Sequence, residues 1–218
     1  ADRIGDEKDG VGLLNRQLNT GGLEKVVACW VGTPVGGLIL SVILYRLLAF
    51  VYNRLSITLF QSDAVLRAGL ILAGSYGAYA LGANNVANVT GVYVEAGKLG
   101  IFSALLLGGL SISFGVVTFS RGVMETVGRR LVRLDPFSAF VVVVAEAVTV
   151  HIYTFVGVPV STSQAVVGAV LGVGFVKGIR TVKGRTLLGI LSAWLLTPAV
   201  ALFLSMAIHV AIRLRYVP

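Results

Sequence analysis

The stretch Pro136–Val176, PFSAFVVVVAEAVTVHIYTFVGVPVSTSQAVVGAVLGVGFV, decides how this chain folds. It runs for 41 residues and contains a single Asp, Glu, Lys or Arg, namely Glu146. A helix needs about 20 apolar residues to cross a bilayer, so the stretch is too long for one crossing and fits two passes or a helical hairpin. Pro159 cannot continue a helix, and the hydroxyl residues after it favour a new helix start. We therefore predict a helix, a break near 157–162, and a second helix.

Four further apolar runs, all uncharged, accompany this stretch: Val26–Tyr45, Ala68–Val94, Leu99–Ser120 and Thr186–Ile212. Only 13% of the 218 residues are charged, against about 25% in soluble domains. The 27 glycines allow helices to approach closely, as membrane helices do. The sequence predicts an all-α polytopic membrane protein. It excludes a disordered chain, a disulfide-rich secreted scaffold and an ordinary cytosolic enzyme, since there is one cysteine and too little charge to cover a soluble surface.

The basic residues gather beside the two ends of the 41-residue run, and the positive-inside rule assigns such clusters to the cytoplasmic side. They are Arg121, Arg129, Arg130 and Arg133 before the run and Lys177, Arg180, Lys183 and Arg185 after it. We therefore expect loops 121–135 and 177–185 to share the cytoplasmic side. The net charge of +8 is explained in this way as a topological signal, so we expect no nucleic acid partner.

The motif W-x-x-T-P occurs twice, at Trp30–Pro34 and at Trp194–Pro198, and each copy follows a G-V-G element by about 20 residues. The two tryptophans lie 164 residues apart. The shared order and spacing predict an internal repeat of about that length. Residues 56–218 then form a complete second repeat, and residues 1–55 form the end of a first repeat, a loop plus one transmembrane helix. The front of that first repeat is expected to lie outside the chain.

The equivalent loops of the two repeats differ in charge. Residues 1–25 carry five acids and four bases, whereas residues 177–185 carry four bases and no acid. Equivalent loops with opposite charge bias indicate opposite sides of the membrane, which is the mark of inverted repeats in secondary transporters. We accordingly expect residues 1–25 to face outside.

Two polar motifs interrupt the apolar runs. The segment 82–88, GANNVAN, places three amides at membrane depth, where protein, water or a substrate must satisfy them. We predict an unwound helix at 84–88 that lines a polar site, with helix–helix hydrogen bonding as the structural alternative. The segment 159–164, PVSTSQ, places three hydroxyls where a helix begins, and free N–H groups with the positive dipole end suit an anion there. Simple N-capping is the alternative for this motif.

These motifs carry a family resemblance. GANNVAN resembles the GANDVAN signature of the inorganic phosphate transporter (PiT) family, and VPVSTSQAVVGAVLGVG is similar to its second signature, in the same order. The resemblance covers about residues 66–212 as one repeat and 1–55 as the end of the other. It implies an inverted-repeat secondary transporter with broken helices and a helical hairpin, multi-pass in the plasma membrane. Its activity would be cation-coupled uptake of phosphate, with sulfate or another tetrahedral oxyanion as the alternative substrate.

The resemblance also implies partners and site residues. By position in the signatures, six residues would bind substrate: Asn84, Asn85, Asn88, Ser161, Thr162 and Ser163. Glu146 takes the place of a family acid before the second signature and would couple a Na⁺ or H⁺, with a sodium ion expected near Asn85, Asn88 and Glu146. Asn85 stands where the family has Asp, so a neutral amide weakens coupling at this position. The implied partners are phosphate, the cation, the first-repeat segment and the lipid bilayer, without a resident cofactor; a homo-oligomer stays open.

We expect the two motifs to meet near mid-membrane and to form half of one oxyanion site. His151 lies five residues after Glu146, off its helical face, and is either a proton relay or a packed neutral side chain. An intramembrane hydrolase using Ser161 with His151 or Glu146 is an alternative, but the chain has no G-x-S-x-G elbow. A non-transporting assembly subunit is the other alternative. We expect no enzyme activity.

Overall fold

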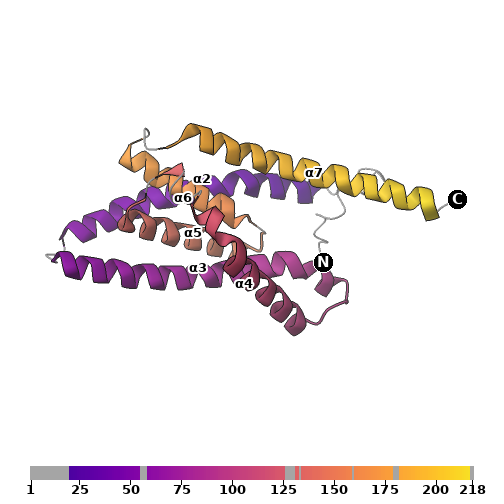
Figure 1. Ribbon diagram of the computed structural model, residues 1–218, viewed down its shortest axis with the longest axis horizontal. Helices are drawn as coiled ribbons and strands as arrows, with labels where there is room; N and C mark the ends of the chain where they lie inside the picture. Colours follow the sequence, from indigo (N-terminus) through magenta and orange to yellow (C-terminus); the bar gives the residue numbers. More distant parts are fainter. Residues whose placement is uncertain are drawn as a thin grey trace. The chain divides into compact units, whose positions relative to one another are not determined.

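The structure, a computed structural model, describes residues 20–54, 58–125, 131–132, 134–158, 160–178 and 182–216. Over these residues it forms helices and no strand, which confirms the predicted all-α class. The helices are α2 (Thr20–Arg54), α3 (Leu59–Glu95), α4 (Ile101–Glu125), α5 (Pro136–Val156), α6 (Thr162–Lys177) and α7 (Gly184–Tyr216) (Figure 1). Pro159, Arg129, Arg130, Arg133, Arg180 and residues 1–19 lie outside the described residues.

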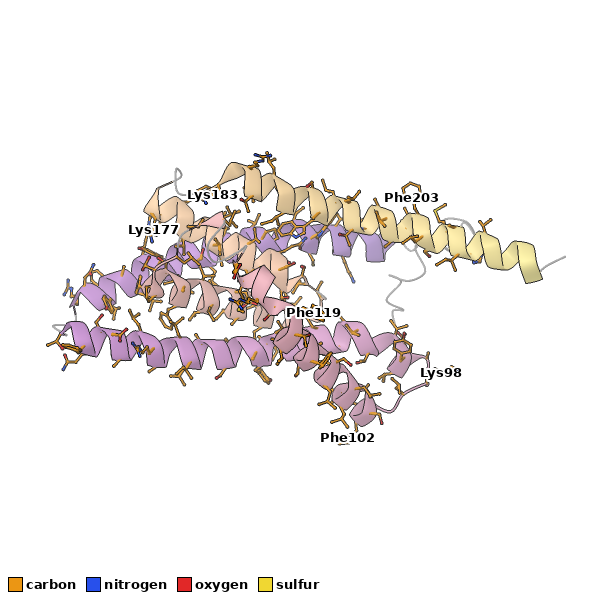
Figure 2. All side chains as sticks on the ribbon, viewed as in Figure 1. Lys98, Phe102, Phe119, Lys177, Lys183 and Phe203 are labelled. Atoms are coloured by element: carbon orange, nitrogen blue, oxygen red, sulfur yellow. The ribbon has the colours of Figure 1, made fainter. Side chains whose placement is uncertain are left out.

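Five of these helices are long and apolar enough to cross a membrane. They contain the spans Val27–Arg54, Phe60–Glu95, Ile101–Gly122, Pro136–Val156 and Gly184–Val210. Large apolar side chains cover the outside of α4, where Phe102 and Phe119 are each 79% exposed (Figure 2). Helices pair their backbone groups internally, as a bilayer without water requires. The predicted multi-pass membrane protein is thereby confirmed.

The chain separates into two compact units. One unit is Val26–Lys183, which contains most of α2 and all of α3, α4, α5 and α6. The other combines Gly184–Pro218, which includes α7, with Ala1–Lys25. Both polar motifs belong to the first unit, so the candidate site is built there. The repeat boundary at residues 55–56 stays a prediction.

The 41-residue run folds as the predicted helix, break and helix. α5 ends at Val156, Gly157 follows with a φ of +75°, and α6 begins after its N-cap residue Ser161. A positive φ is easily reached only by glycine, which makes Gly157 a natural helix stop. The predicted break near 157–162 is therefore confirmed.

The two ends of this run meet, so α5 and α6 form an antiparallel hairpin (Figure 1). Lys177, the last residue of α6, makes an ion pair with Asp135, the N-cap residue of α5. The flanking loops are also joined, because Lys183 N donates to Leu131 O at 3.1 Å. Loops 121–135 and 177–185 therefore share one side, as predicted. That this side is the cytoplasm stays a prediction.

The predicted unwinding at 84–88 is wrong. α3 runs without interruption from Leu59 to Glu95, straight through GANNVAN. Asparagine keeps its backbone N–H, so it leaves the helical hydrogen bonds intact and brings only a polar side chain that needs a partner. Asn84 finds its partner outside the helix, at the tip of the hairpin. A polar motif in an apolar run therefore does not require a broken helix.

α2 packs against the α5–α6 hairpin, with its backbone in close contact with the backbone of α6. A Cβ added at Gly37 on α2 would lie 2.5 Å from Ala165 O on α6, and one added at Gly168 on α6 would collide with Pro34 O on α2. Small residues at these positions let the two helices approach more closely than any side chain would allow. Tyr153 and Cys29 pack against the small buried cluster beside this contact.

Candidate functional site

Asn84 fastens α3 to the break between α5 and α6. Its Nδ2 donates to Val160 O at 2.8 Å, and its Oδ1 accepts from Val160 N at 3.5 Å. The same Nδ2 donates to Asn85 Oδ1 at 2.9 Å. Asn84 is only 3% exposed, so the protein itself satisfies this amide. The two polar motifs meet as predicted, and Asn84 serves there as a clamp on the hairpin backbone.

The first turn of α6 presents hydroxyls and backbone N–H groups. Ser161 is the N-cap residue, but its side chain makes no capping hydrogen bond. Its Oγ instead shares a hydrogen bond of 2.8 Å with Ser163 Oγ. The N–H groups of Thr162 and Ser163 are in the first turn, where a helix offers them no acceptor. Simple N-capping is therefore not what Ser161 does, and its hydroxyl leaves the first-turn N–H groups of α6 uncapped.

The remaining amides lie along α3 beside this contact. Asn85 is half-buried and accepts from Asn84, whereas Asn88 is exposed. Asn88 is one helical turn, about 6 Å, further along α3 than Asn84. The structure thus brings Asn84 to the hairpin tip, joins Asn85 to Asn84, and places Asn88 on the next turn.

Glu146 lies in the same α3–α5 interface, away from the hairpin tip. Its Oε2 is 3.6 Å from the place that a Cβ on Gly77 would take. Gly77 precedes Asn84 by seven residues, which is two turns, or about 10 Å along α3. Among the residues that the structure describes, no three His, Cys, Asp or Glu side chains cluster as a metal site. A cation near Glu146 would therefore depend on this carboxylate together with amide, hydroxyl or carbonyl oxygens.

His151 is held in an aromatic cluster between α3 and α5. Its Nδ1 shares a hydrogen bond of 2.5 Å with Tyr76 Oη, and its ring stacks on Phe155 with centroids 4.6 Å apart. Tyr79 adds an edge contact at 5.6 Å. His151 thus bonds Tyr76, and Ser161 bonds Ser163. This arrangement does not pair a general base with a nucleophile, as a hydrolase would require.

Sequence reasoning missed the role of Gln164. Pro34 has no N–H, so the carbonyl of Trp30 loses its helical donor. With its amide oriented to satisfy its neighbours, Gln164 donates to Trp30 O at 3.3 Å and accepts from the Trp30 indole N–H. Gln164 is only 2% exposed, so it ties α6 to α2 at a buried position. The available signal was the proline in W-x-x-T-P, which creates a carbonyl in need of a donor.

Comparisons with known proteins agree with this architecture. Residues 9–205 match the family model described as the phosphate transporter family. A relative from Methanocaldococcus jannaschii, named "Putative phosphate permease", is 29% identical over 199 residues, which cover 91% of this chain and 64% of the relative. A sulfate permease of Bacillus subtilis is 27% identical over 197 residues, covering 90% of this chain and 55% of the permease.

A solved structure shares the fold. It is named "The sodium-dependent phosphate transporter" and superposes with a TM-score of 0.76 at 27% identity, covering 94% of this chain and 71% of that chain. The chain spans 64% and 55% of the lengths of the two relatives above. The family match covers nearly the whole chain, from residue 9 to residue 205. This chain belongs to the phosphate transporter family.

Proposed function

We propose that this chain supplies about half of a cation-coupled secondary transporter for inorganic phosphate. The observation that carries the proposal is the first turn of α6, where Ser161 leaves the helix end uncapped and bonds Ser163 instead. Membership of the phosphate transporter family supports the substrate class. The proposal concerns the whole transporter, because the chain spans only part of its relatives' length.

The chemistry of this turn suits a tetrahedral oxyanion. Ser161, Thr162 and Ser163 bring hydroxyl donors, and the first-turn N–H groups add the positive end of the α6 dipole. Neither polar motif contains Arg or Lys. Binding would therefore depend on neutral donors and a co-bound cation, which lets phosphate leave again once the cation has gone.

The cation is assigned to Glu146. It is the only acid in the 41-residue run, and an acidic side chain in a membrane segment is generally functional. Asn85 is neutral, so Glu146 is the acid that this half offers. The solved relative is described as sodium-dependent, which favours Na⁺ over H⁺ as the coupling ion.

Sulfate is the second candidate substrate, because a relative that covers 90% of this chain is named a sulfate permease. Both anions are tetrahedral and accept from the same donors. Uptake of labelled phosphate by the full-length protein in liposomes, with sulfate as competitor, separates the two. If phosphate is the substrate, phosphate uptake should continue in the presence of excess sulfate. Complete inhibition of phosphate uptake by equimolar sulfate would identify sulfate as the preferred substrate.

The site itself is tested by removing one hydroxyl. Thr162→Ala should weaken phosphate binding by about five- to 150-fold, the equivalent of ~1–3 kcal/mol for one lost donor. Thr154→Ala is the matched control, since the Thr154 hydroxyl bonds Val150 O at 2.8 Å within α5. Calorimetry on the full-length protein would measure both variants. Equal affinities for Thr162→Ala and the parent would remove the first turn of α6 from the site.

Cation coupling is tested separately. Glu146→Gln should abolish the dependence of phosphate uptake on the sodium or proton gradient. Glu125→Gln is the matched control, because Glu125 is a partly exposed acid at the end of α4 that pairs with Arg121. If uptake by Glu146→Gln still follows the cation gradient, Glu146 is a structural residue.

We also propose that residues 56–218 are one complete repeat and residues 1–55 the end of a preceding, inverted one. Supporting this, both W-x-x-T-P motifs take the same local form. Pro34 lies inside α2 and Pro198 inside α7. Each preceding threonine donates to the carbonyl four residues back, Thr33 to Cys29 O at 2.6 Å and Thr197 to Ala193 O at 2.8 Å.

A further inference from the structure

Two helices of this chain begin with the same sequence signature for a closed N-terminus. In a capping box, Ser or Thr at the N-cap and Glu or Gln three residues later each accept from the other's backbone N–H. α3 begins with Thr58 and Gln61 in these positions, and α6 begins with Ser161 and Gln164. We call these pairs the α3 capping box and the α6 capping box.

The α3 capping box is closed. Thr58 N donates to Gln61 Oε1 at 2.9 Å, and Gln61 N donates to Thr58 Oγ1 at 3.4 Å. Both residues are exposed, and their side chains satisfy the end of their own helix. The signature therefore closes a helix in this chain when both side chains turn back to the backbone.

The α6 capping box is open, although its sequence is equivalent. Ser161 Oγ bonds Ser163 Oγ and caps no N–H. Gln164 turns toward α2, where its side-chain amide donates to Trp30 O at 3.3 Å and accepts from the Trp30 indole N–H. The backbone of the first turn is nevertheless formed, since Gln164 N donates to Ser161 O at 3.1 Å. Both side chains that could close this helix end are thus engaged elsewhere.

Pro34 explains why Gln164 turns away from its own helix. Pro34 has no N–H, so the Trp30 carbonyl has no helical donor, and a buried carbonyl without a donor is costly. Gln164 is only 2% exposed and supplies that donor. The two helices are held close, because a Cβ added at Gly168 on α6 would collide with Pro34 O. All of these residues belong to the unit Val26–Lys183.

We propose that Trp30 and Pro34 hold the α6 capping box open for an anion, and that Gln164 closes the box when it loses its contact with Trp30. This rests on the proposed function, in which the anion binds at the first turn of α6. Once released, the Gln164 amide oxygen would accept from Ser161 N–H, as Gln61 accepts from Thr58 N–H. It would then compete with the anion for that donor.

Gln164 is accordingly a positioning residue, because its amide bonds α2 and not the anion. α2 in turn controls the donors of a helix end to which it contributes no ligand. The α3 capping box shows the state that α6 would reach without this control.

Phosphate binding to variants of the full-length protein tests the proposal. In Trp30→Phe/Pro34→Ala the indole donor is gone and the carbonyl at residue 30 regains a helical donor, so α2 no longer holds the Gln164 amide. Calorimetry should show phosphate binding weakened by about two- to 30-fold, the equivalent of one capping interaction. Adding Gln164→Leu to this double variant should restore the affinity, because Leu cannot accept from an N–H.

The triple variant keeps both changes on α2, so a loss of affinity caused by altered helix packing would persist in it. Gln61→Leu, added to the same double variant, is the matched control and should restore nothing, because it opens only the α3 capping box. The proposal is overturned if the double variant binds phosphate like the parent, if Gln164→Leu restores no affinity, or if Gln61→Leu restores as much.

Hydrogen exchange measured by mass spectrometry without phosphate gives a readout that does not depend on transport. The peptide of residues 160–166 should exchange more slowly in the double variant than in the triple variant, because the released Gln164 protects Ser161 N–H. Equal exchange in the two variants would also overturn the proposal. If the exchange rates differ but no variant and no parent binds phosphate, the proposed function fails while the control of α6 by α2 stands.

Discussion

Two polar motifs lie in apolar runs of this chain, and the structure accommodates them in opposite ways. GANNVAN stays inside the continuous helix α3, whereas the PVSTSQ region separates α5 from α6. Asparagine adds a polar side chain and leaves the backbone hydrogen bonds intact, whereas proline lacks an N–H and Gly157 takes a positive φ. The comparison teaches that a polar side chain in a membrane helix calls for a partner, while the helix ends where the backbone itself turns away, as it does at Gly157. A proline alone does not end a helix here, because Pro34 lies inside α2 and Pro198 inside α7.

The strongest test of this comparison removes the side chain that joins the two motifs. Asn84→Ala would leave both Val160 N and Val160 O without their partner, at a cost of about 1–3 kcal/mol of unfolding free energy for each group. Asn88→Ala changes the same residue type one turn away at an exposed position, and should alter stability by less than ~0.5 kcal/mol. Thermal unfolding of the full-length protein in detergent compares them. Equal destabilisation of both variants would contradict the clamp.

The next test exchanges one glycine in each motif region. Gly157→Ala should destabilise the protein by about 1–2 kcal/mol, because its φ of +75° is costly for a residue with a Cβ. Gly82→Ala, inside α3, meets open space and should be neutral or stabilise by up to ~1 kcal/mol through helix propensity. The same unfolding assay applies. A stabilising Gly157→Ala would mean that the break does not depend on the left-handed backbone.

The smallest expected effect concerns the end of the hairpin opposite the break, where Asp135 and Lys177 form an ion pair. Burial opposes ionisation of Asp135, but hydrogen bonds from Lys177, the Ser138 hydroxyl and the Ser138 backbone N–H outweigh it and lower the pKa of Asp135 from 3.8 to about 2. A lowered pKa in the folded state means that the carboxylate stabilises the fold above pH 3.8 and that this contribution disappears as the pH falls to about 2.

The ion pair is partly exposed, so this contribution should stay below ~1 kcal/mol. Asp135→Asn should flatten the pH dependence of unfolding between pH 4 and pH 2, about the interval between the two pKa values. Asp63→Asn is the matched control, because Asp63 pairs with Arg67 on the exposed surface of α3. An unchanged pH profile in Asp135→Asn would show that the pair contributes nothing to the hairpin.

The sequence predicts structural features that depend on neighbouring residues, such as helix breaks. It misses side-chain contacts between residues that are far apart in the chain. The break at 157–162 follows from local backbone chemistry, and the apolar runs follow from their own length. The partner of Asn84 could not be predicted, because it is Val160, 76 residues further along the chain. The role of Gln164 could not be predicted for the same reason, since its partner Trp30 lies on another helix.

The Asn84–Val160 contact also limits how a transporter of this kind could open. Any movement that parts α3 from the hairpin tip must break the two hydrogen bonds between Asn84 and Val160. α3 and the hairpin tip should therefore move as one rigid body during alternating access. An anion bound by Ser161, Thr162 and Ser163 would move together with α3 and the hairpin tip. The path by which it is released would then open on a side of the site other than the Asn84–Val160 contact.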